Sequence, residues 1–241
     1  MDVSLPSGSW DTHIHCFDLQ WYPFRSTRAY THGPAPLGEL VENSLTNQVV
    51  LVQASIEDGH DGLVAHFSRI RKEYAHILAR GTICMDESWT NLDNSHVDVL
   101  HQLGVRSWRI HEQFLLVAQS YAAKTHGWSI SAQLPLQAWT ALKQFLLHDK
   151  EINCHDNCRP QCLRRAGGYL QFRIQIFSRA AIVWPPDDFH NMQSVIQSFA
   201  DTASCSLLWG SGWPHVNPAN KSVHLPIDAP KIDIRGELKA L

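Results

Sequence analysis

The chain has 241 residues and a mass of 27.3 kDa, and 44% of its residues are hydrophobic, so it can bury a sizeable core without disulfide bonds. Lys and Arg number 20 against 23 Asp and Glu, and the resulting charge of −3 argues against binding to nucleic acid or to an anionic membrane surface. No run approaches the roughly 18 apolar residues of a bilayer span, and Met1–Gly8 lacks the features of a secretion signal, so we expect a cytoplasmic protein.

Apolar runs alternate with helical patterns along the chain, which predicts an α/β protein. The predicted strands are Trp10–His15, Val49–Ser55, Leu78–Met85, Val105–His111, Trp128–Leu134, Glu151–His155, Leu170–Phe177 and Leu207–Gly210. The predicted helices are Leu37–Leu45, Gly62–His76, Val97–Leu103, Ser120–His126, Leu136–Lys150 and Asp187–Thr202. Eight such strands favour a (β/α)8 TIM barrel.

This expected barrel is trimmed. Residues 156–169 hold an Arg159-Pro160 pair and a Gly167-Gly168 break, too little for a covering helix, and after Pro214 only a short helix is predicted at Gly236–Leu241. No repeat or linker divides the chain, so we expect a single domain over residues 1–241.

The cysteines do not indicate a disulfide framework or a zinc cluster. Six are spread along a chain without a secretory context, so we expect them to be reduced. Cys154, Cys158 and Cys162 stand four apart beside His155, whereas zinc sites use shorter spacings in two separated pairs. A structural role is the better interpretation of these three residues.

The first predicted strand ends in Asp11-Thr12-His13-Ile14-His15. Alternate residues of a strand point to the same side, so His13 and His15 are expected to project together at the carboxyl end of the strand. Two converging imidazoles can share a divalent ion such as zinc or bind a substrate oxygen. Packing of both rings in the core is an equally good interpretation of this pair taken alone.

A second motif, Leu207-Leu208-Trp209-Gly210-Ser211-Gly212-Trp213-Pro214-His215, lies near the other end of the chain. Together with the first motif, it resembles the amidohydrolase-related (amidohydrolase 2) family of metallo-dependent TIM-barrel hydrolases, and within it the 2-pyrone-4,6-dicarboxylate lactonase-like branch. Further matches, within a resemblance that covers residues 9 to about 218, are Tyr22-Pro23-Phe24 leading to Arg28 and Tyr30, Val52-Gln53-Ala54-Ser55, Gly104-Val105-Arg106 to Arg109, and Asp187-Asp188-Phe189.

The resemblance implies a hydrolase that opens a small cyclic ester, a pyrone or a related carboxylated or phenolic lactone. His13 and His15 match the first-strand pair of the family, which also makes them the candidate ligands of a weakly bound zinc ion, and His155 lies near the sixth-strand histidine. The resemblance places Arg109 and Arg179 where substrate carboxylates bind, a task that suits a bidentate guanidinium, and it adds Tyr30, Ser55 and His215 to the substrate site. For either arginine alone, a surface ion pair is the more ordinary interpretation.

Two departures from the family pattern concern the chemistry. Gly212 stands where the family has an aspartate that ligates metal or activates water, and glycine has no side chain for either task. His155-Asp156 reverses the usual order of the sixth strand, which would turn the imidazole to the other face and could bring Asp156 inward as a base. Other candidate bases are Glu57, Asp58, His111 and Glu112.

Three functions therefore remain open, each with a small-molecule partner. The first is lactone hydrolysis by an alternative base. The second is a non-hydrolytic tailoring or binding protein that guides an isomerisation, cyclisation or decarboxylation. The third is a catalytically impaired family member, which the missing aspartate at Gly212 would explain.

Overall fold

The structure is a computed structural model of the chain. It describes residues 5–84, 94–111, 125–133, 153–156, 173–177, 207–215, 222–226 and 232–236, together with residues 197 and 201. In the strands at 153–156 and 173–177 it is the backbone alone that is described.

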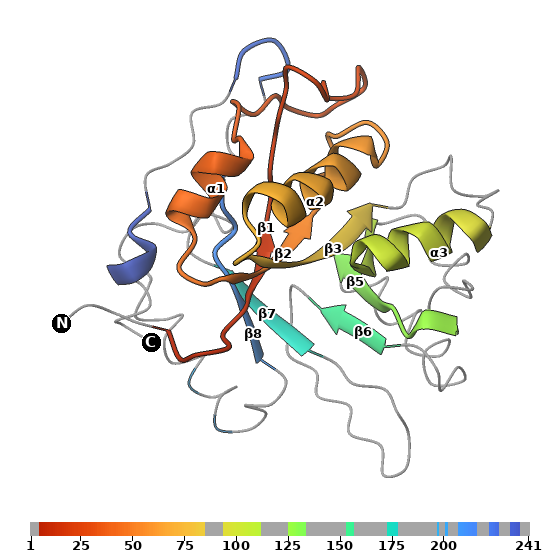
Figure 1. Cartoon of the computed structure of the whole chain (residues 1–241). Coiled ribbons are helices and arrows are strands. Elements are labelled where there is room, and N and C mark those ends of the chain that lie inside the picture. The colour runs from red at the N-terminus through yellow and green to blue at the C-terminus, as the bar shows by residue number, and fades with distance from the viewer. Residues whose placement is uncertain are drawn as a thin grey trace.

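A parallel sheet of eight strands runs through the molecule in the order β1-β2-β3-β4-β5-β6-β7-β8, so every strand pairs with its neighbours in the sequence (Figure 1). The strands are β1 (Asp11–Ile14), β2 (Gln48–Val52), β3 (Leu78–Cys84), β4 (Val105–His111), β5 (Ser129–Gln133), β6 (Asn153–Asp156), β7 (Arg173–Phe177) and β8 (Leu207–Gly210). Because all eight are parallel, their carboxyl ends lie at one edge of the sheet, and the ends of β1, β2, β4 and β8 place the side chains considered below.

The eight strand predictions are confirmed, with ends that differ by a few residues. Val105–His111 and Leu207–Gly210 agree at both ends, whereas the second strand stops at Val52 because Gln53 to Ser55 already belong to the following turn segment. Buried Val49, Leu51 and Ile83 lie in these strands, so the aliphatic runs that predicted them do form the core.

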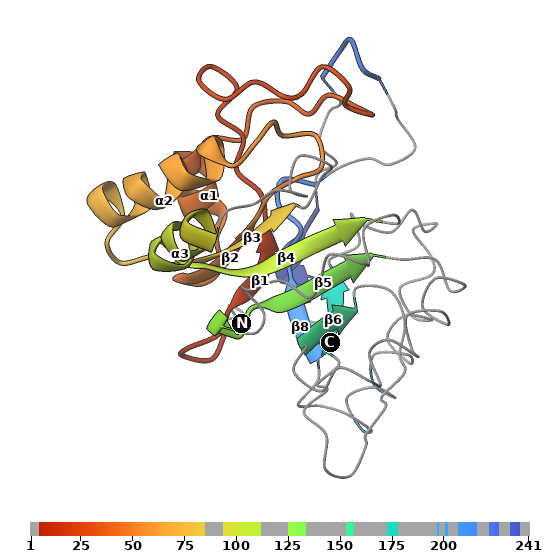
Figure 2. The same cartoon turned by 90° about the vertical axis from the view of Figure 1, so that its right-hand side faces the viewer.

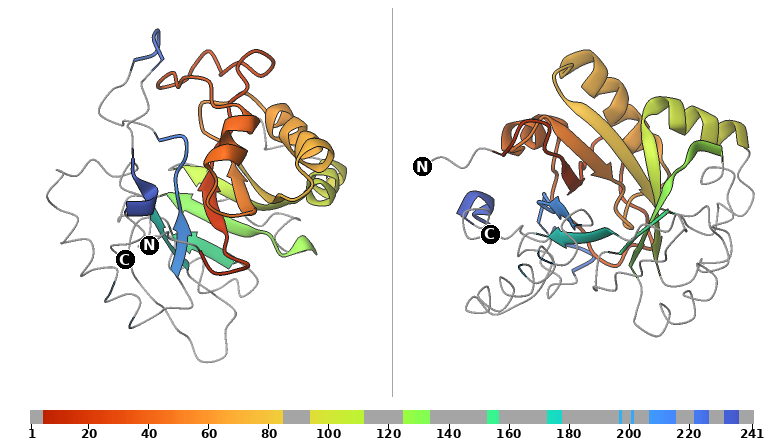
Figure 3. Two further views of the ribbon diagram at one scale, coloured as in Figure 1. Left: turned by 60° about the vertical axis from the view of Figure 1, so that its left-hand side comes forward. Right: turned by 90° about the horizontal axis from the view of Figure 1, so that it is seen from below.

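The predicted (β/α)8 TIM barrel is wrong. The three helices whose bounds are described each follow a strand before β4, and among the described residues ladders join consecutive strands from β1 to β8 with none that joins β8 to β1. Beyond the strand ends, Gly212 N donates to His13 O over 2.9 Å and His15 N donates to Trp213 O over 2.7 Å. Figure 3 shows β8 beside β1. The barrel was predicted from the number of strands, and that number determines neither the covering helices nor a pairing between the first and last strand.

The three helices confirm predictions for the first half of the chain, and Figure 2 shows them on one side of β1 to β4. They are α1 (Leu37–Asn43), α2 (Asp61–Glu73) and α3 (Asn94–Leu103). In α2 the buried side chains Leu63, Phe67 and Ile70 repeat every three or four residues and so form one apolar face against the sheet. Asp61 in its first turn and Arg71 and Lys72 in its last also suit the helix dipole.

The predicted helix Leu136–Lys150 and the connection at 157–169 lie outside the described residues, as do most of Ser120–His126 and most of Gly236–Leu241. Of the predicted helix Asp187–Thr202, Gln197 and Asp201 are described, and both are helical. In the part of the chain that the structure describes, no helix is both long enough and apolar enough to cross a lipid bilayer.

Two apolar clusters hold the described part together. The larger one lies between the helices and the strands and includes Leu51, Phe67, Ile83 and Leu100. The smaller one, Phe17, Ala35, Ala54 and Ile56, lies beyond the carboxyl ends of β1 and β2, with Tyr30 and Trp213 packed against it. The smaller cluster supports the segment 17–35 next to the end of β1.

Candidate active site at the carboxyl ends of β1, β4 and β8

The two histidines of the first motif converge as predicted. His13 Nε2 and His15 Nε2 lie 3.2 Å apart, both side chains are buried, and the rings meet edge to face with centroids 4.9 Å apart. The two-residue interval between His13 in β1 and His15 just after it therefore directs both imidazoles to the same side of the sheet.

The hydrogen bond on the other side of His15 fixes its tautomer. His15 Nδ1 lies 2.6 Å from Val52 O, and because a carbonyl only accepts, Nδ1 carries the proton. Burial lowers the pKa of His15 to about 3, helped by the positive charges of Arg109 and His32 and opposed by the bond to Val52. The ring is neutral at pH 7, so His15 Nε2 accepts a hydrogen bond from His13 Nε2–H.

Arg109 and Tyr30 belong to the same site. Arg109 lies in β4, opposite Cys84 of β3, and its positive charge acts on both His15 and Tyr30. Burial raises the pKa of Tyr30, and Arg109 opposes that rise. The phenol therefore stays protonated at neutral pH beside a guanidinium, an arrangement that suits an acidic or oxygen-rich ligand.

The segment after β8 completes this end of the sheet. Asp11 Oδ1 accepts hydrogen bonds from His13 N over 3.2 Å and from Ser211 N over 3.0 Å, so one buried carboxyl joins the first motif to the second. Burial raises the pKa of Asp11 to about 6, although the bonds from Ser211 and His13 oppose this. Gly212 has a φ of 69°, which is the left-handed region that glycine adopts without strain, and the Trp213-Pro214 bond is cis.

His215 is buried directly after this turn. Burial lowers its pKa to about 4, which the Gly212 carbonyl opposes and the charge of His32 reinforces. Its backbone oxygen lies 3.1 Å from His32 Nε2. His215 thus supports the turn after β8 and stays neutral at pH 7.

The remaining predicted residues are placed less tightly or not described. Ser55 is exposed after β2, as is Asp58, whereas Glu57 is partly covered and binds Ala54 N through Oε2. Burial raises the pKa of Glu57 to about 8, so it is protonated at pH 7. His155 and Asp156 end β6 and His111 ends β4, and of these three residues the backbone alone is described. Arg179 and Glu112 lie outside the described residues.

Neither His32 nor Asp11 was among the site residues predicted from the sequence. His32 is buried among the residues that follow Tyr30, but one of 15 histidines in a polar segment shows no spacing that would single it out. Asp11 carried a signal, because an acidic residue two positions before His13 sits at the start of the same strand face.

The described residues provide two of the ligands that a zinc site would need. With Zn–N bonds of about 2.0–2.1 Å and tetrahedral angles, two nitrogen ligands stand roughly 3.3 Å apart, which the 3.2 Å between His13 Nε2 and His15 Nε2 matches. A protein zinc site needs three or four protein ligands, and within the described ranges no group of three His, Cys, Asp or Glu side chains comes together. The described residues alone therefore do not supply the ligands of a zinc site, and the mechanism below uses side chains alone.

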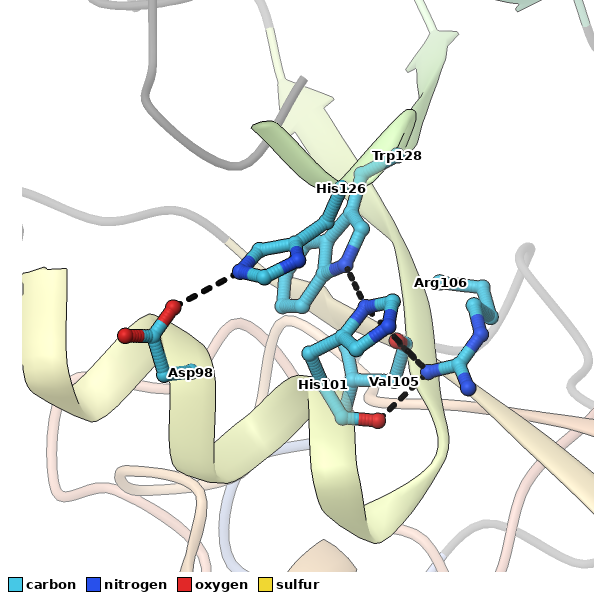
Figure 4. A network of polar contacts seen from close by, with 6 residues as sticks. All are labelled: Asp98, His101, Val105, Arg106, His126 and Trp128. Atoms are coloured by element: carbon cyan, nitrogen blue, oxygen red, sulfur yellow. Dashed lines mark hydrogen bonds and ion pairs between the residues drawn. The ribbon is translucent and has the colours of Figure 1, made fainter. Parts of the chain in front are cut away.

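A second histidine cluster lies at the opposite ends of the strands, before β4 and β5 (Figure 4). Trp128 Nε1 donates to His101 Nδ1 over 2.9 Å, His126 Nε2 pairs with Asp98 Oδ1 at 2.7 Å, and the two imidazoles stack with centroids 4.2 Å apart. Arg106 Nη1 donates to His101 O and Val105 O. These contacts fasten α3 to β4 and β5 far from His13 and His15.

Replacing His215 with leucine should reduce the fall in the free energy of unfolding that occurs as the pH drops below 6.5. Native His215 takes its proton near pH 4 and the unfolded chain near 6.5, so stability from this residue is complete above pH 6.5 and is lost as the pH falls toward 4. Between pH 6.5 and pH 5 the wild type should lose about 2 kcal/mol that the variant does not lose. Urea unfolding of both proteins, followed by circular dichroism at pH 8, 6.5 and 5, measures this difference, and a constant difference would contradict it.

Comparison with known proteins gives a fold and no family. No protein-family model matches the chain, and no curated protein matches its sequence. A crystal structure of the Agrobacterium tumefaciens protein ATU3138 in its apo form is similar, with a TM-score of 0.64 and 16% sequence identity over 94% of this chain and 85% of that one. At this identity the likeness shows that the two proteins share a fold and nothing about activity.

Proposed function

We propose that the chain is a hydrolase that opens a small cyclic ester, in the manner of the lactonase-like branch of the amidohydrolase-related family. The observation that carries the proposal is the convergence of His13 Nε2 and His15 Nε2 at 3.2 Å, beside the charge of Arg109 at the ends of β1 and β4. A base held by a neutral partner, with a cation next to it, can promote the attack of water on a carbonyl.

His13 is the base in this proposal and His15 positions it. His13 donates Nε2–H to His15, so the lone pair of the neutral His13 ring is on Nδ1. As water adds to the lactone carbonyl, His13 takes one proton from it. When the ring C–O bond breaks, His13 returns that proton to the leaving oxygen, and the product is the open hydroxy acid.

Arg109 and Tyr30 bind the substrate in this proposal. The guanidinium pairs with a carboxylate or phenolate of the lactone, and the protonated Tyr30 hydroxyl donates to an oxygen. Both groups also stabilise the negative charge that forms on the carbonyl oxygen during attack.

A non-hydrolytic binding or tailoring protein is the second candidate, and Gly212 favours it. No carboxylate projects from this position, and its φ of 69° means that an aspartate here would adopt a strained backbone. A pocket that isomerises or cyclises its ligand has no need for a base that activates water.

Ultraviolet-monitored hydrolysis of a panel of pyrone and aryl lactones tests the hydrolase. We expect turnover by the wild type and a loss of 100-fold or more, ~10²–10⁴, in His13→Ala, because the variant has no group to take the proton of water. His76→Ala, at an exposed position between α2 and β3, is the matched control and should keep full activity. Absence of turnover in folded wild type across the panel would sink the hydrolase proposal.

A pair of variants at Gly212 separates the two candidates. Gly212→Asp and Gly212→Asn impose the same backbone strain, but only the first adds a carboxylate. A hydrolase that has lost its aspartate should gain turnover in Gly212→Asp over Gly212→Asn, whereas a binding or tailoring pocket should lose ligand affinity in both.

A further inference from the structure

The ring of His32 lies between two carbonyl groups. Its Nδ1 is 2.8 Å from Gly33 O and its Nε2 is 3.1 Å from His215 O, and the side chain is 2% exposed. The first carbonyl belongs to the segment 17–35, and the second belongs to the turn that follows β8. The ring therefore spans the two segments that border the candidate active site.

Both contacts can be hydrogen bonds only when the ring carries two protons. A carbonyl oxygen accepts and never donates, and a neutral imidazole has one N–H group. In the neutral ring, one nitrogen lone pair would face an oxygen lone pair, and that contact would be repulsive. The arrangement is thus complete in the imidazolium form and loses one bond when the ring is deprotonated.

The histidines that interact with His32 do not change their own charge near neutral pH. The charge of a protonated His32 acts on His15, which follows β1, and on His215 after β8, and the pKa values of about 3 and about 4 of these two residues keep both neutral near pH 7. Among the described residues no carboxylate forms an ion pair with His32. The ring of Phe17 has its centroid 5.2 Å from that of His32 and is tilted by 50°, and a cation at this distance from an aromatic ring is stabilised.

Phe17 connects His32 to the candidate active site. Its ring is nearly parallel to that of His15, at 12° and with centroids 5.7 Å apart, and its backbone pairs with Ala35 in both directions. The order of the segment 17–35 therefore bears on the position of the His15 ring.

We propose that His32 is a proton-dependent link that holds the segment 17–35 against the turn 211–215 when its ring is doubly protonated. When the ring loses a proton, the remaining hydrogen stays on Nδ1 in the shorter contact to Gly33 O at 2.8 Å, and the contact of Nε2 to His215 O at 3.1 Å is lost. The His32 ring affects the site only by holding the two segments in place, and this role requires no bound ligand. It stands independently of the hydrolase proposal, because it concerns two backbone carbonyls and one ring.

Release of the link loosens the segment without unfolding it. Thr31 N still donates to Ser222 O over 2.9 Å, and Ala35 N still donates to Phe17 O over 3.0 Å. Those two amides report on the segment, and loss of one neighbouring hydrogen bond should reduce their protection from exchange about fivefold.

The test combines two nuclear magnetic resonance measurements on the full-length chain between pH 5.5 and pH 8. Nitrogen-15 spectra of the histidine rings give the protonation of His32, and amide hydrogen exchange, corrected for its intrinsic pH dependence, gives the protection of Thr31 and Ala35. We expect two proton-bearing ring nitrogens at the acid end, one at the alkaline end, and a protection that falls about fivefold along the same titration curve.

The matched variants are His32→Phe and His76→Phe. His32→Phe keeps an aromatic ring beside Phe17 but has no proton to lose, so the protection should remain at the alkaline wild-type level throughout, whereas His76→Phe should behave as wild type. If His32→Phe does not fold, the wild-type curves still decide. A His32 ring that titrates with no change in the protection of Thr31 and Ala35, or that holds one proton throughout the range, would overturn the proposal.

Discussion

Replacing Asp11 with alanine is expected to lower the free energy of unfolding by about 3 kcal/mol. Asp11 Oδ1 accepts from His13 N and from Ser211 N, and the side chain is 2% exposed, so alanine would leave two buried N–H groups without their acceptor. Each such group costs about 1–3 kcal/mol when no water replaces the bond. Chemical denaturation at pH 7 measures the loss, and a cost below 1 kcal/mol would show that this carboxyl does not hold β1 to the turn after β8.

Asp11→Asn is the matched control, because its amide oxygen keeps an acceptor without the charge. Native Asp11 holds its proton up to a pH of about 6, whereas the unfolded chain loses it near 3.8, so its contribution is complete below pH 3.8 and is lost as the pH rises through 6. The Asn variant has no such loss. Between pH 4 and pH 7 its free energy of unfolding, measured relative to that of the wild type, should therefore rise by up to about 3 kcal/mol. A gap that does not change with pH would contradict the burial of this charge.

Replacing Gly81 with alanine is expected to cost about 2 kcal/mol. A Cβ at this position of β3 would lie 2.8 Å from Cζ and 2.9 Å from Cε2 of Phe67, closer than non-bonded carbon atoms approach. Phe67 is a buried residue of α2 and is packed in the larger apolar cluster, so its ring cannot move aside without opening a gap. Thermal and urea unfolding of the variant measure the cost.

Two further variants test the cause of that loss. Gly38→Ala in α1 makes the same chemical change where the nearest atom to the new Cβ is Tyr74 Oη at 3.6 Å, and it should not destabilise the protein. Phe67→Leu should be less costly in the Gly81→Ala background than in the wild type, because the smaller side chain leaves room for the new methyl group. Additive costs would place the strain somewhere other than this contact.

The sequence predicted the strands well because each strand is a compact aliphatic run buried on the sheet. Leu51, Ile83 and Val105 are fully covered, and runs of this kind have few alternatives. The architecture was not predicted correctly, because the contacts between β1 and the segment after β8, and the placement of covering helices, depend on parts of the chain that are far apart in the sequence. The hydrogen bond between Gly212 N and His13 O joins residues that no local pattern connects.

The candidate site also contains residues that could be predicted from the sequence and residues that could not. His13 and His15 were predictable because a two-residue interval on a strand fixes a shared direction, and the structure brings their nitrogens to 3.2 Å. His32 was not, because its role depends on two backbone carbonyls, and backbone groups are the same in every sequence. The tautomer of His15 was equally hidden, since it follows from the carbonyl of Val52.

The contacts between β1 and the turn after β8 also bear on the order of events during synthesis. Asp11 and Ser211 are separated by 200 positions, so the amino-terminal strands and helices emerge from the ribosome roughly ten seconds or more before their last partner, at ~5–20 residues per second. Strands β1 to β4 can pack against α1, α2 and α3 in that interval, while the carboxyl of Asp11 and the carbonyl of His13 remain hydrated. Water is displaced from the candidate site only when residues 207–215 arrive, which makes assembly of the site a late step that a nascent chain stalled before residue 207 should lack.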